Sequence, residues 1–259
     1  MDLGLKSRRA LVCAASAGLG RSCALALARE GVAVTITGRH LETLEKTAQE
    51  LRDLTGATIL ISVGDITTAA GRAAALEICP DPDILVNNAG GPPPGNISDF
   101  TEADWQSALN ANMLTPIALI KATIDGMVAR RFGRIVNITS AAVKSPIGSL
   151  ALSNGARTGL TGVIGGWSRQ VAQHNVTINN LLPGLFDTDR LRKTTEAAAR
   201  AKGLDVEAGV AERTQSIPAG RIGHPDEFGA ACAFLCAAQA GYIVGQNILL
   251  DGGAFNSTI

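Results

Sequence analysis

A glycine-rich segment near the start of the chain has the composition and spacing of a phosphate-binding turn. Residues 13–22 read CAASAGLGRS, and they lie between a short apolar run and a longer amphipathic stretch. Gly18 and Gly20 would let backbone amides at the start of a helix approach a pyrophosphate, because the helix dipole and unpaired N–H groups favour an anion there. A single Gly-x-Gly is weak evidence, but its place between a predicted strand and a predicted helix strengthens it. The segment therefore predicts a dinucleotide site.

The second apolar run indicates which dinucleotide is bound. It ends in Thr37-Gly38-Arg39-His40, without the Asp or Glu that bonds the ribose 2′-hydroxyl in NAD-binding folds. Arg39 is instead placed to meet a 2′-phosphate. We therefore expect NADP in preference to NAD; the alternative is that Arg39 is a solvated charge on a surface loop.

Short apolar runs alternate with longer helical stretches along the whole chain, as in a parallel sheet covered by helices. The runs predict strands over residues 10–14, 33–37, 58–63, 84–87, 134–139, 177–182 and 247–250. Helices are predicted over stretches that include residues 21–30, 41–54, 101–130, 154–173 and 226–237. Such alternation implies right-handed crossovers and a doubly wound α/β fold, with ligands at the carboxyl ends of the strands. We expect one domain over residues 1–259.

Further motifs stand in the order found in short-chain dehydrogenase/reductases. They are Asp65, Asn87-Asn88-Ala89-Gly90, Asn112, Asn179, Pro183-Gly184 with Thr188, and YIVGQ and LLDGG near the end. The chain resembles this family over nearly its whole length, as a divergent member similar to β-ketoacyl carrier-protein reductases, which implies a Rossmann-type fold of seven strands. It departs from the family's TGxxxGxG loop at Cys13 and Ala14, and we expect Ala14 to keep φ below zero.

The resemblance also implies which residues contact the cofactor. In the glycine loop these are Ser16, Gly18, Leu19 and Gly20. Asp65 and Ile66 would meet the adenine. The ribose side would be met by Asn88, Ala89 and Gly90, with Arg157, and the nicotinamide carboxamide by Pro183, Gly184, Leu185 and Thr188.

The catalytic set that the resemblance implies is altered in this chain. The family places a Ser thirteen residues before a Tyr, and a Lys four residues after it, where this chain has Ser140, Ser153 and Arg157. Ser140 and Asn112 match the family's Ser and Asn. A serine hydroxyl has too high a pKa to replace the phenol as an acid near neutral pH. A guanidinium can bond a ribose and stabilise an alkoxide, but it stays protonated.

No other side chain is an obvious replacement for the missing acid. The chain's one tyrosine is Tyr242, within YIVGQ, and Lys144 is either a substitute acid or an exposed loop lysine. Loss of a positioned acid typically slows a reaction about 10²- to 10⁴-fold. A weak enzyme is therefore expected.

Two loops near the predicted site have alternative interpretations. Residues 189–217 are polar and break the strand-helix alternation, as a substrate lid would, or as a helical surface excursion with no moving part would. Residues 90–95 read GGPPPG, which is either a rigid rim of the substrate pocket or a stiff connection without ligand contact.

Three functions fit these observations. The first is an NADP-linked oxidoreductase acting on a carbonyl or hydroxyl group of a small molecule. The second is a dinucleotide-binding sensor or partner subunit with little or no turnover. The third is a lyase-like enzyme similar to halohydrin dehalogenases, which carry Arg in the Lys position but keep the Tyr and remodel the dinucleotide loop. This chain also has Arg in the Lys position, but it lacks the Tyr and keeps the glycine-rich dinucleotide loop.

Composition limits the partners. Lys plus Arg and Asp plus Glu both total 23, which argues against nucleic-acid or membrane-surface binding. A leader and a membrane span are not apparent, so a cytoplasmic protein is expected, with five scattered cysteines as reduced, buried residues and no metal site. Relatives commonly form homodimers or homotetramers, and the apolar stretches 113–128 and 160–171 could serve as such interfaces.

Overall fold

A seven-stranded, all-parallel sheet with the order β3-β2-β1-β4-β5-β6-β7 runs through the computed structural model, which describes residues 2–257. The strands are β1 (Arg9–Val12), β2 (Ala33–Gly38), β3 (Ile59–Val63), β4 (Ile84–Asn87), β5 (Gly133–Ile138), β6 (Val176–Pro183) and β7 (Asn247–Leu250). The predicted doubly wound, Rossmann-type fold is confirmed. Every predicted strand is present, because buried apolar runs of this length have few other places in an α/β protein.

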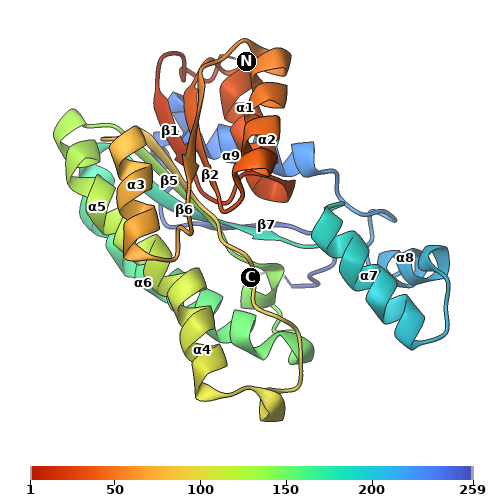
Figure 1. The fold of residues 1–259 in the computed structure, drawn as a ribbon. Helices are drawn as coiled ribbons and strands as arrows, with labels where there is room; N and C mark the ends of the chain where they lie inside the picture. The colour runs from red at the N-terminus through yellow and green to blue at the C-terminus, as the bar shows by residue number, and fades with distance from the viewer. Residues whose placement is uncertain (1, 258–259) are drawn as a thin grey trace.

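Helices cover both faces of the sheet (Figure 1). One face carries α1 (Gly18–Arg29), α2 (Leu41–Thr55) and α9 (Pro225–Cys236), and the other carries α3 (Ala69–Ile78), α5 (Thr115–Arg130) and α6 (Ala151–Val171). The two core clusters are aliphatic, with residues such as Leu27, Ile36 and Leu44 on the first face and Leu85, Ile120 and Leu160 on the second. All five cysteines are buried and free, as expected.

The helix predicted over residues 101–130 is interrupted by a π-helical turn. It consists of α4 (Glu102–Leu109), the π turn Asn110–Leu114 and α5. A capping box starts α4, since the Thr101 hydroxyl accepts from the Asp104 N–H and the Asp104 carboxylate accepts from the Thr101 N–H. Asn112 lies within the π turn and is 5% exposed.

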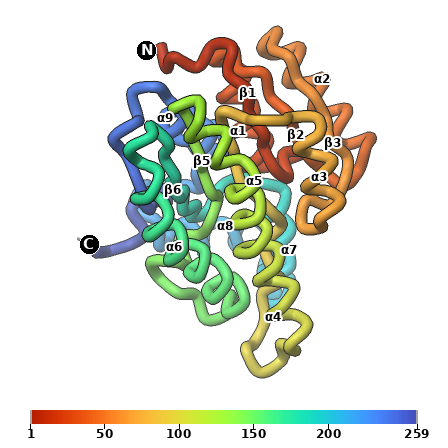
Figure 2. The backbone as a smooth tube through the Cα atoms, turned by 90° about the vertical axis from the view of Figure 1, so that its left-hand side faces the viewer, coloured from red at the N-terminus to blue at the C-terminus, as the bar shows by residue number. Residues whose placement is uncertain are grey.

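The polar segment that breaks the alternation forms two further helices, α7 (Asp189–Ala201) and α8 (Val206–Thr214). They pack on each other outside the two helical layers, to the right in Figure 1, and Arg213 Nη2 on α8 donates to the Thr194 carbonyl on α7 over 3.3 Å. Figure 2 shows α4 and α7 toward the lower side of the molecule. Among the helices of the described chain, none combines the length and apolar character that crossing a membrane requires.

A ladder of four asparagines, three of them buried and the last half-buried, fixes the register of four neighbouring strands. Asn87, Asn137, Asn180 and Asn247 stand at matched positions on β4, β5, β6 and β7. Each amide donates to the next, with N–O distances of 2.8 Å, 3.0 Å and 2.7 Å along the series. A shift of an inner strand, β5 or β6, by one residue would turn its asparagine to the other face and break two of these bonds. The carboxyl ends of β4 to β7 are therefore held at one level.

Removal of an inner rung should destabilise the protein. Asn137→Leu keeps the side-chain size but leaves the Asn87 donor and the Asn180 acceptor buried without partners. Each such group costs about 1–3 kcal/mol, so we expect the free energy of unfolding in urea to fall by at least about 2 kcal/mol.

The matched control is Thr177→Val on β6. Thr177 is 1% exposed and its hydroxyl has no hydrogen-bond partner in the described structure, so this isosteric change should be neutral or slightly stabilising. Equal losses in the two variants would show that the ladder does not contribute to stability.

Candidate active site

The glycine-rich segment connects β1 to α1 at the carboxyl edge of the sheet. Gly18 has a φ of +58°, a conformation that L side chains rarely adopt, and a Cβ at Gly20 would lie 2.5 Å from the Ala14 carbonyl oxygen and 2.8 Å from Asn88 Nδ2. Ser16 is tied to α2, because its carbonyl accepts from Thr47 Oγ1 over 2.8 Å. Leu19 and Gly20 begin α1. The loop is tightly packed on its own backbone.

Ala14 corrects our expectation of a negative φ. Its φ is +46°, in the left-handed region that the family's glycine would favour. Three contacts hold it there: its N–H donates to Thr37 Oγ1 over 3.0 Å, its carbonyl accepts from Asn88 Nδ2 over 3.1 Å, and the next amide, of Ala15, donates to the Thr37 carbonyl over 2.9 Å. The expectation was wrong because these contacts to β2 and β4 override the local preference of alanine.

The first turn of α1 has unclaimed amides. Its N-cap residue, Ala17, has an extended backbone and provides no side-chain cap, and the first turn contains no acidic residue. The N–H groups of this turn are therefore free of side-chain acceptors within the described chain, and the positive end of the helix dipole is not neutralised locally. This end of α1 can accept an anion.

The residues predicted to hold the adenosine end follow β2 and β3. Arg39 is exposed directly after β2, and its charge helps to lower the pKa of the Asp65 carboxyl. The larger causes of that shift are the hydrogen bonds that Asp65 Oδ1 accepts from the Thr67 N–H, over 2.9 Å, and the Thr67 hydroxyl, over 2.8 Å. Ile66 is 5% exposed and belongs to the core. Arg39 and Asp65 thus lie near each other at the ends of neighbouring strands.

The residues predicted to meet the ribose and nicotinamide follow β4 and β6. Asn88 bonds to Ala14 as described, Ala89 is half-buried and Gly90 is exposed. Pro183 ends β6, the Gly184 N–H donates to the Leu250 carbonyl over 2.8 Å, and the Leu185 carbonyl accepts from Gly223 over 3.0 Å. A Cβ at Gly18 would lie 3.5 Å from Thr188 Cγ2, so the β6 loop lies against the glycine loop.

Ser140 and Asn112 lie at the ends of elements that face this edge. Ser140 follows β5, is half-buried, and its hydroxyl accepts from the Ala142 N–H over 3.1 Å. The Asn112 side chain donates to the Ala108 carbonyl over 3.3 Å and weakly to the Gly90 carbonyl over 3.5 Å. Asn112 therefore connects the π turn to the loop after β4. No signal in the sequence had marked that turn.

Ser153 and Arg157 lie one helical turn apart at the start of α6, and each is 8% exposed. Arg157 Nη1 donates to the carbonyls of Ile138 and Thr139, both over 2.6 Å, at the end of β5. Its Nε is buried without a hydrogen-bond partner among the described residues. Burial, with a smaller contribution from the charge of Arg190, lowers the pKa of Arg157 to about 10, so the guanidinium is still protonated at neutral pH.

Neither alternative acid from the sequence is placed in this set. Tyr242 is fully exposed in the turn before β7. The Lys144 ammonium lies 5.6 Å from the centre of the Phe255 ring, toward the C-terminal residues. No phenol of the described chain is therefore among these residues.

One residue that the sequence analysis missed enters the site from α7. Arg190 Nη2 donates to the Pro92 carbonyl over 3.1 Å, in the loop predicted as a rim. A signal was available, because Arg190 lies in the first turn of its helix, where the dipole favours acidic residues. A cation in that position suggests a contact outside the helix.

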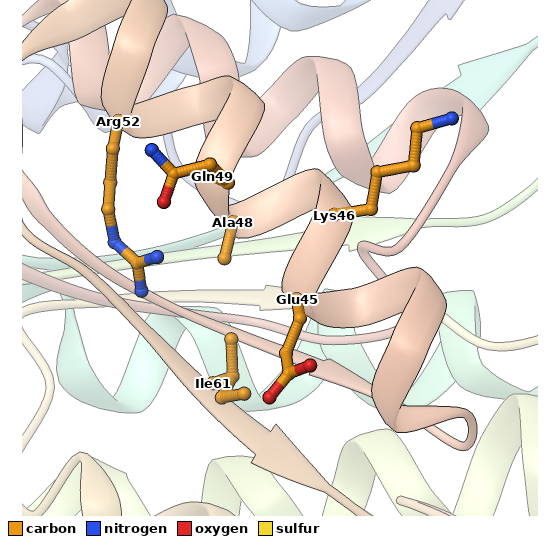
Figure 3. Close-up of a pocket in the computed structure, with 6 residues that line it drawn as sticks. All are labelled: Glu45, Lys46, Ala48, Gln49, Arg52 and Ile61. Atoms are coloured by element: carbon orange, nitrogen blue, oxygen red, sulfur yellow. The ribbon is translucent and has the colours of Figure 1, made fainter.

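A surface depression lies away from these residues. It has a volume of about 460 Å³ and lies between the outer side of α2 and Ile61 of β3 (Figure 3). Glu45 and Arg52 point into it, and the Arg52 guanidinium is already bonded to the Ile59 carbonyl, over 2.6 Å from Nη2. The candidate site is therefore assigned from the converging strand-end loops and not from this hollow. Within residues 2–257, no cluster of His, Cys, Asp or Glu is suited to hold a metal ion.

Comparison with known proteins identifies the family. The model of the short chain dehydrogenase family matches residues 8–199. The chain is 30% identical to the NADPH-dependent reductase BacG of Bacillus subtilis over 98% of this chain and 100% of the relative. It is 32% identical to the 3-oxoacyl-[acyl-carrier-protein] reductase FabG of Vibrio cholerae over 98% of this chain and 99% of that protein.

The structural comparison agrees. The crystal structure of L-sorbose reductase from Gluconobacter frateurii, complexed with NADPH and L-sorbose, superposes with a TM-score of 0.95 at 26% identity, covering 99% of this chain and all of the other. The resemblance drawn from the motifs is thus confirmed on both sequence and fold. The chain belongs to the short-chain dehydrogenase family and is an oxidoreductase.

Proposed function

We propose that the chain is an NADP-linked enzyme that transfers hydride to or from a carbonyl or hydroxyl carbon of a small-molecule substrate. The observation that carries the proposal is the meeting of the glycine loop, Asn88 and Thr188 at the same sheet edge as Ser140 and Arg157. Relatives described as NADPH-dependent, or solved with NADPH, support the choice of cofactor.

The residues present fit this dinucleotide. The uncapped first turn of α1 offers amides to a pyrophosphate, and exposed Arg39, at the end of a strand β2 that is followed by no Asp or Glu for a ribose 2′-hydroxyl, suits a 2′-phosphate. The proposed pyrophosphate contacts are Ser16, Gly18, Leu19 and Gly20, and the proposed adenosine contacts are Arg39, Asp65 and Ile66. The second ribose would be contacted by Asn88, Ala89, Gly90 and Arg157. The carboxamide would be contacted by Pro183, Gly184, Leu185 and Thr188.

The chain's own residues would polarise the substrate. Bound NADPH supplies the hydride. The Ser140 hydroxyl would donate to the substrate oxygen, and the charge of Arg157 would stabilise negative charge on that oxygen. Ser153 keeps its proton near neutral pH, so the product oxygen would receive its proton from water, held on the Asn112 side of the site. Such an enzyme lacks the factor of about 10² to 10⁴ that a positioned acid contributes.

A dinucleotide-binding protein with little turnover is the second candidate. It is favoured by the state of Arg157, because Nη1 is committed to two backbone carbonyls, and by the exposure of the chain's one tyrosine, Tyr242. It shares the cofactor contacts with the first candidate and differs only in the absence of hydride transfer.

We further propose one domain over the chain, with residues 189–217 as a substrate lid. One sheet collects strands from both ends of the chain, which supports a single unit. The contact between Arg190 and Pro92 supports the lid, since it links α7 to the loop after β4.

Five free, buried thiols favour the cytoplasm as the location of the protein, and cell fractionation tests that location.

Arg39→Ala should remove the preference for a phosphorylated dinucleotide. We expect the Kd for NADPH to rise about 10- to 100-fold, because a charged hydrogen bond to the 2′-phosphate is lost, while the Kd for NADH stays unchanged. Lys46→Ala, at an exposed cation on α2 that points away from the depression in Figure 3, should change neither value. Equal affinities of the wild-type protein for NADPH and NADH would exclude this role of Arg39.

Ser140→Ala should slow NADPH oxidation in the presence of ketones and β-ketoacyl thioesters. Removal of one donor to a developing oxyanion typically costs about 10²- to 10³-fold in kcat. The Kd for NADPH should not change. Because the charge of Arg157 would stabilise the same substrate oxygen, the activity of the wild type should fall as the pH rises through the Arg157 pKa of about 10. Ser145→Ala, in an exposed part of the same loop, is the control.

Two results would reject turnover at this site. One is a wild-type rate no higher than that of Ser140→Ala while NADPH still binds, which selects the binding protein. The other is failure to bind any pyridine nucleotide, which rejects both candidates.

We propose that the chain forms a homo-oligomer, either a dimer or a tetramer. Gly162, Gly165 and Gly166 leave part of α6 without neighbouring side chains in the described chain, and all four residues of β7 are only half-buried. Light scattering should give two or four times the chain mass of 26.6 kDa, and a monomer would contradict the proposal.

A further inference from the structure

Arg190 spans two loops that flank the candidate site. It lies in the first turn of α7, just after Thr188, and its guanidinium reaches the loop after β4 to bond the Pro92 carbonyl. A Cβ at Gly91 would collide with this guanidinium, so the close approach depends on glycine at that position. Gly91 and Pro92 directly follow the Asn88–Gly90 segment.

The loop that Arg190 touches is also bound to the catalytic segment. Asn112 donates to Gly90, and the Gly95 N–H donates to the Ser149 carbonyl over 2.9 Å, in the loop between Ser140 and α6. The pyrophosphate is proposed at α1, on the glycine loop. Arg190 is thus directed to the loop connected with the substrate side of the site.

The charge of Arg190 is not neutralised. Three other cations of α7 and its end, Arg192, Arg200 and Lys202, each pair with a carboxylate, from Asp187, Glu196 and Glu212 respectively, whereas Lys193 has no ion pair among the described residues. Neither Arg190 nor Arg157 forms an ion pair within the described residues, and the charge of Arg190 contributes to the lowered pKa of Arg157. The guanidiniums of Arg190 and Arg157 therefore both place an unpaired positive charge at the substrate side of the candidate site.

We propose that Arg190 is a specificity-determining residue that binds a carboxylate of the substrate, which makes the substrate a keto acid or the corresponding hydroxy acid. This inference rests on the proposed function. Pro92 takes one of the five N–H donors of the guanidinium, so a pair of donors is available for a bidentate contact. An anion between Arg190 and Arg157 would also relieve their mutual repulsion.

The test compares α- and β-keto acids with their methyl esters as substrates of the full chain with NADPH. We expect kcat/KM to be about 10- to 100-fold higher for the acids than for the esters. Arg190→Met should abolish that preference by raising KM for the acids, so that acids and esters are used with equal kcat/KM, while the Kd for NADPH stays unchanged. Arg192→Met is the matched control on the same helix and should retain the preference.

A second variant moves the guanidinium without removing its charge. Gly91→Ala introduces a methyl group where the Arg190 guanidinium now lies, and only the flexible end of that side chain must yield. It should reduce the preference for acids in the same direction. A binding readout covers slow turnover: with NADP bound, a hydroxy acid should raise the Tm of the wild type and not that of Arg190→Met.

The possible outcomes distinguish failure of the Arg190 proposal from failure of the proposed oxidoreductase function. Equal use of acids and esters by the wild type, or identical behaviour of Arg190→Met and Arg192→Met, overturns the inference and leaves the oxidoreductase standing. A raised Kd for NADPH in Arg190→Met with an unchanged preference for acids assigns Arg190 to a cofactor phosphate and also overturns it. No binding of NADPH to the wild type removes the proposed function itself.

Discussion

The buried amide ladder across β4 to β7 is the constraint on which the candidate site depends. Asparagine is costly in a sheet core unless each amide is paired, and here the pairing is possible in only one register. That register sets the level at which four strands end. The loops that follow β4, β5 and β6 supply Asn88, Ser140 and Thr188, so the relative heights of these residues follow from bonds made one to eight residues earlier in each strand.

The same dependence explains the strain at the glycine loop. Ala14 is held in the left-handed region by bonds to Thr37 on β2 and to Asn88 after β4. Gly20 then allows the start of α1 to lie against that backbone. The unfavourable conformation of one alanine, of roughly 1–2 kcal/mol, is therefore compensated by contacts from two neighbouring strands. The first amides of α1, which follows this loop, have no capping side chain and can bind an anion.

The sequence predicted the parts of the molecule that are determined locally. Apolar runs of four to six residues predicted the strands, and ordered motifs predicted the family. The π turn around Asn112, the φ of Ala14 and the destination of Arg190 were missed or wrongly predicted, because each is decided by contacts between segments far apart in the chain. Helix α3 was also missed, since its Ala-rich sequence, residues 69–78, has little amphipathic pattern. The roles of the site residues stay predictions.

The replacement of lysine by arginine at position 157 follows from the surroundings that the structure gives it. The side chain is 8% exposed and has no carboxylate partner in the described chain, and burial, with a smaller contribution from the charge of Arg190, lowers its pKa to about 10. The same burial would lower the pKa of a lysine, which is ordinarily about 10.4, toward neutral pH and so weaken its hold on the charge. Arginine keeps the charge and can bond two carbonyls of the β5 end at once. Since no tyrosine stands at position 153, a lysine would have no phenol to activate. A permanent cation beside a second cation is suited instead to stabilising negative charge on a bound molecule, and Arg157 and Arg190 are therefore best understood as a pair.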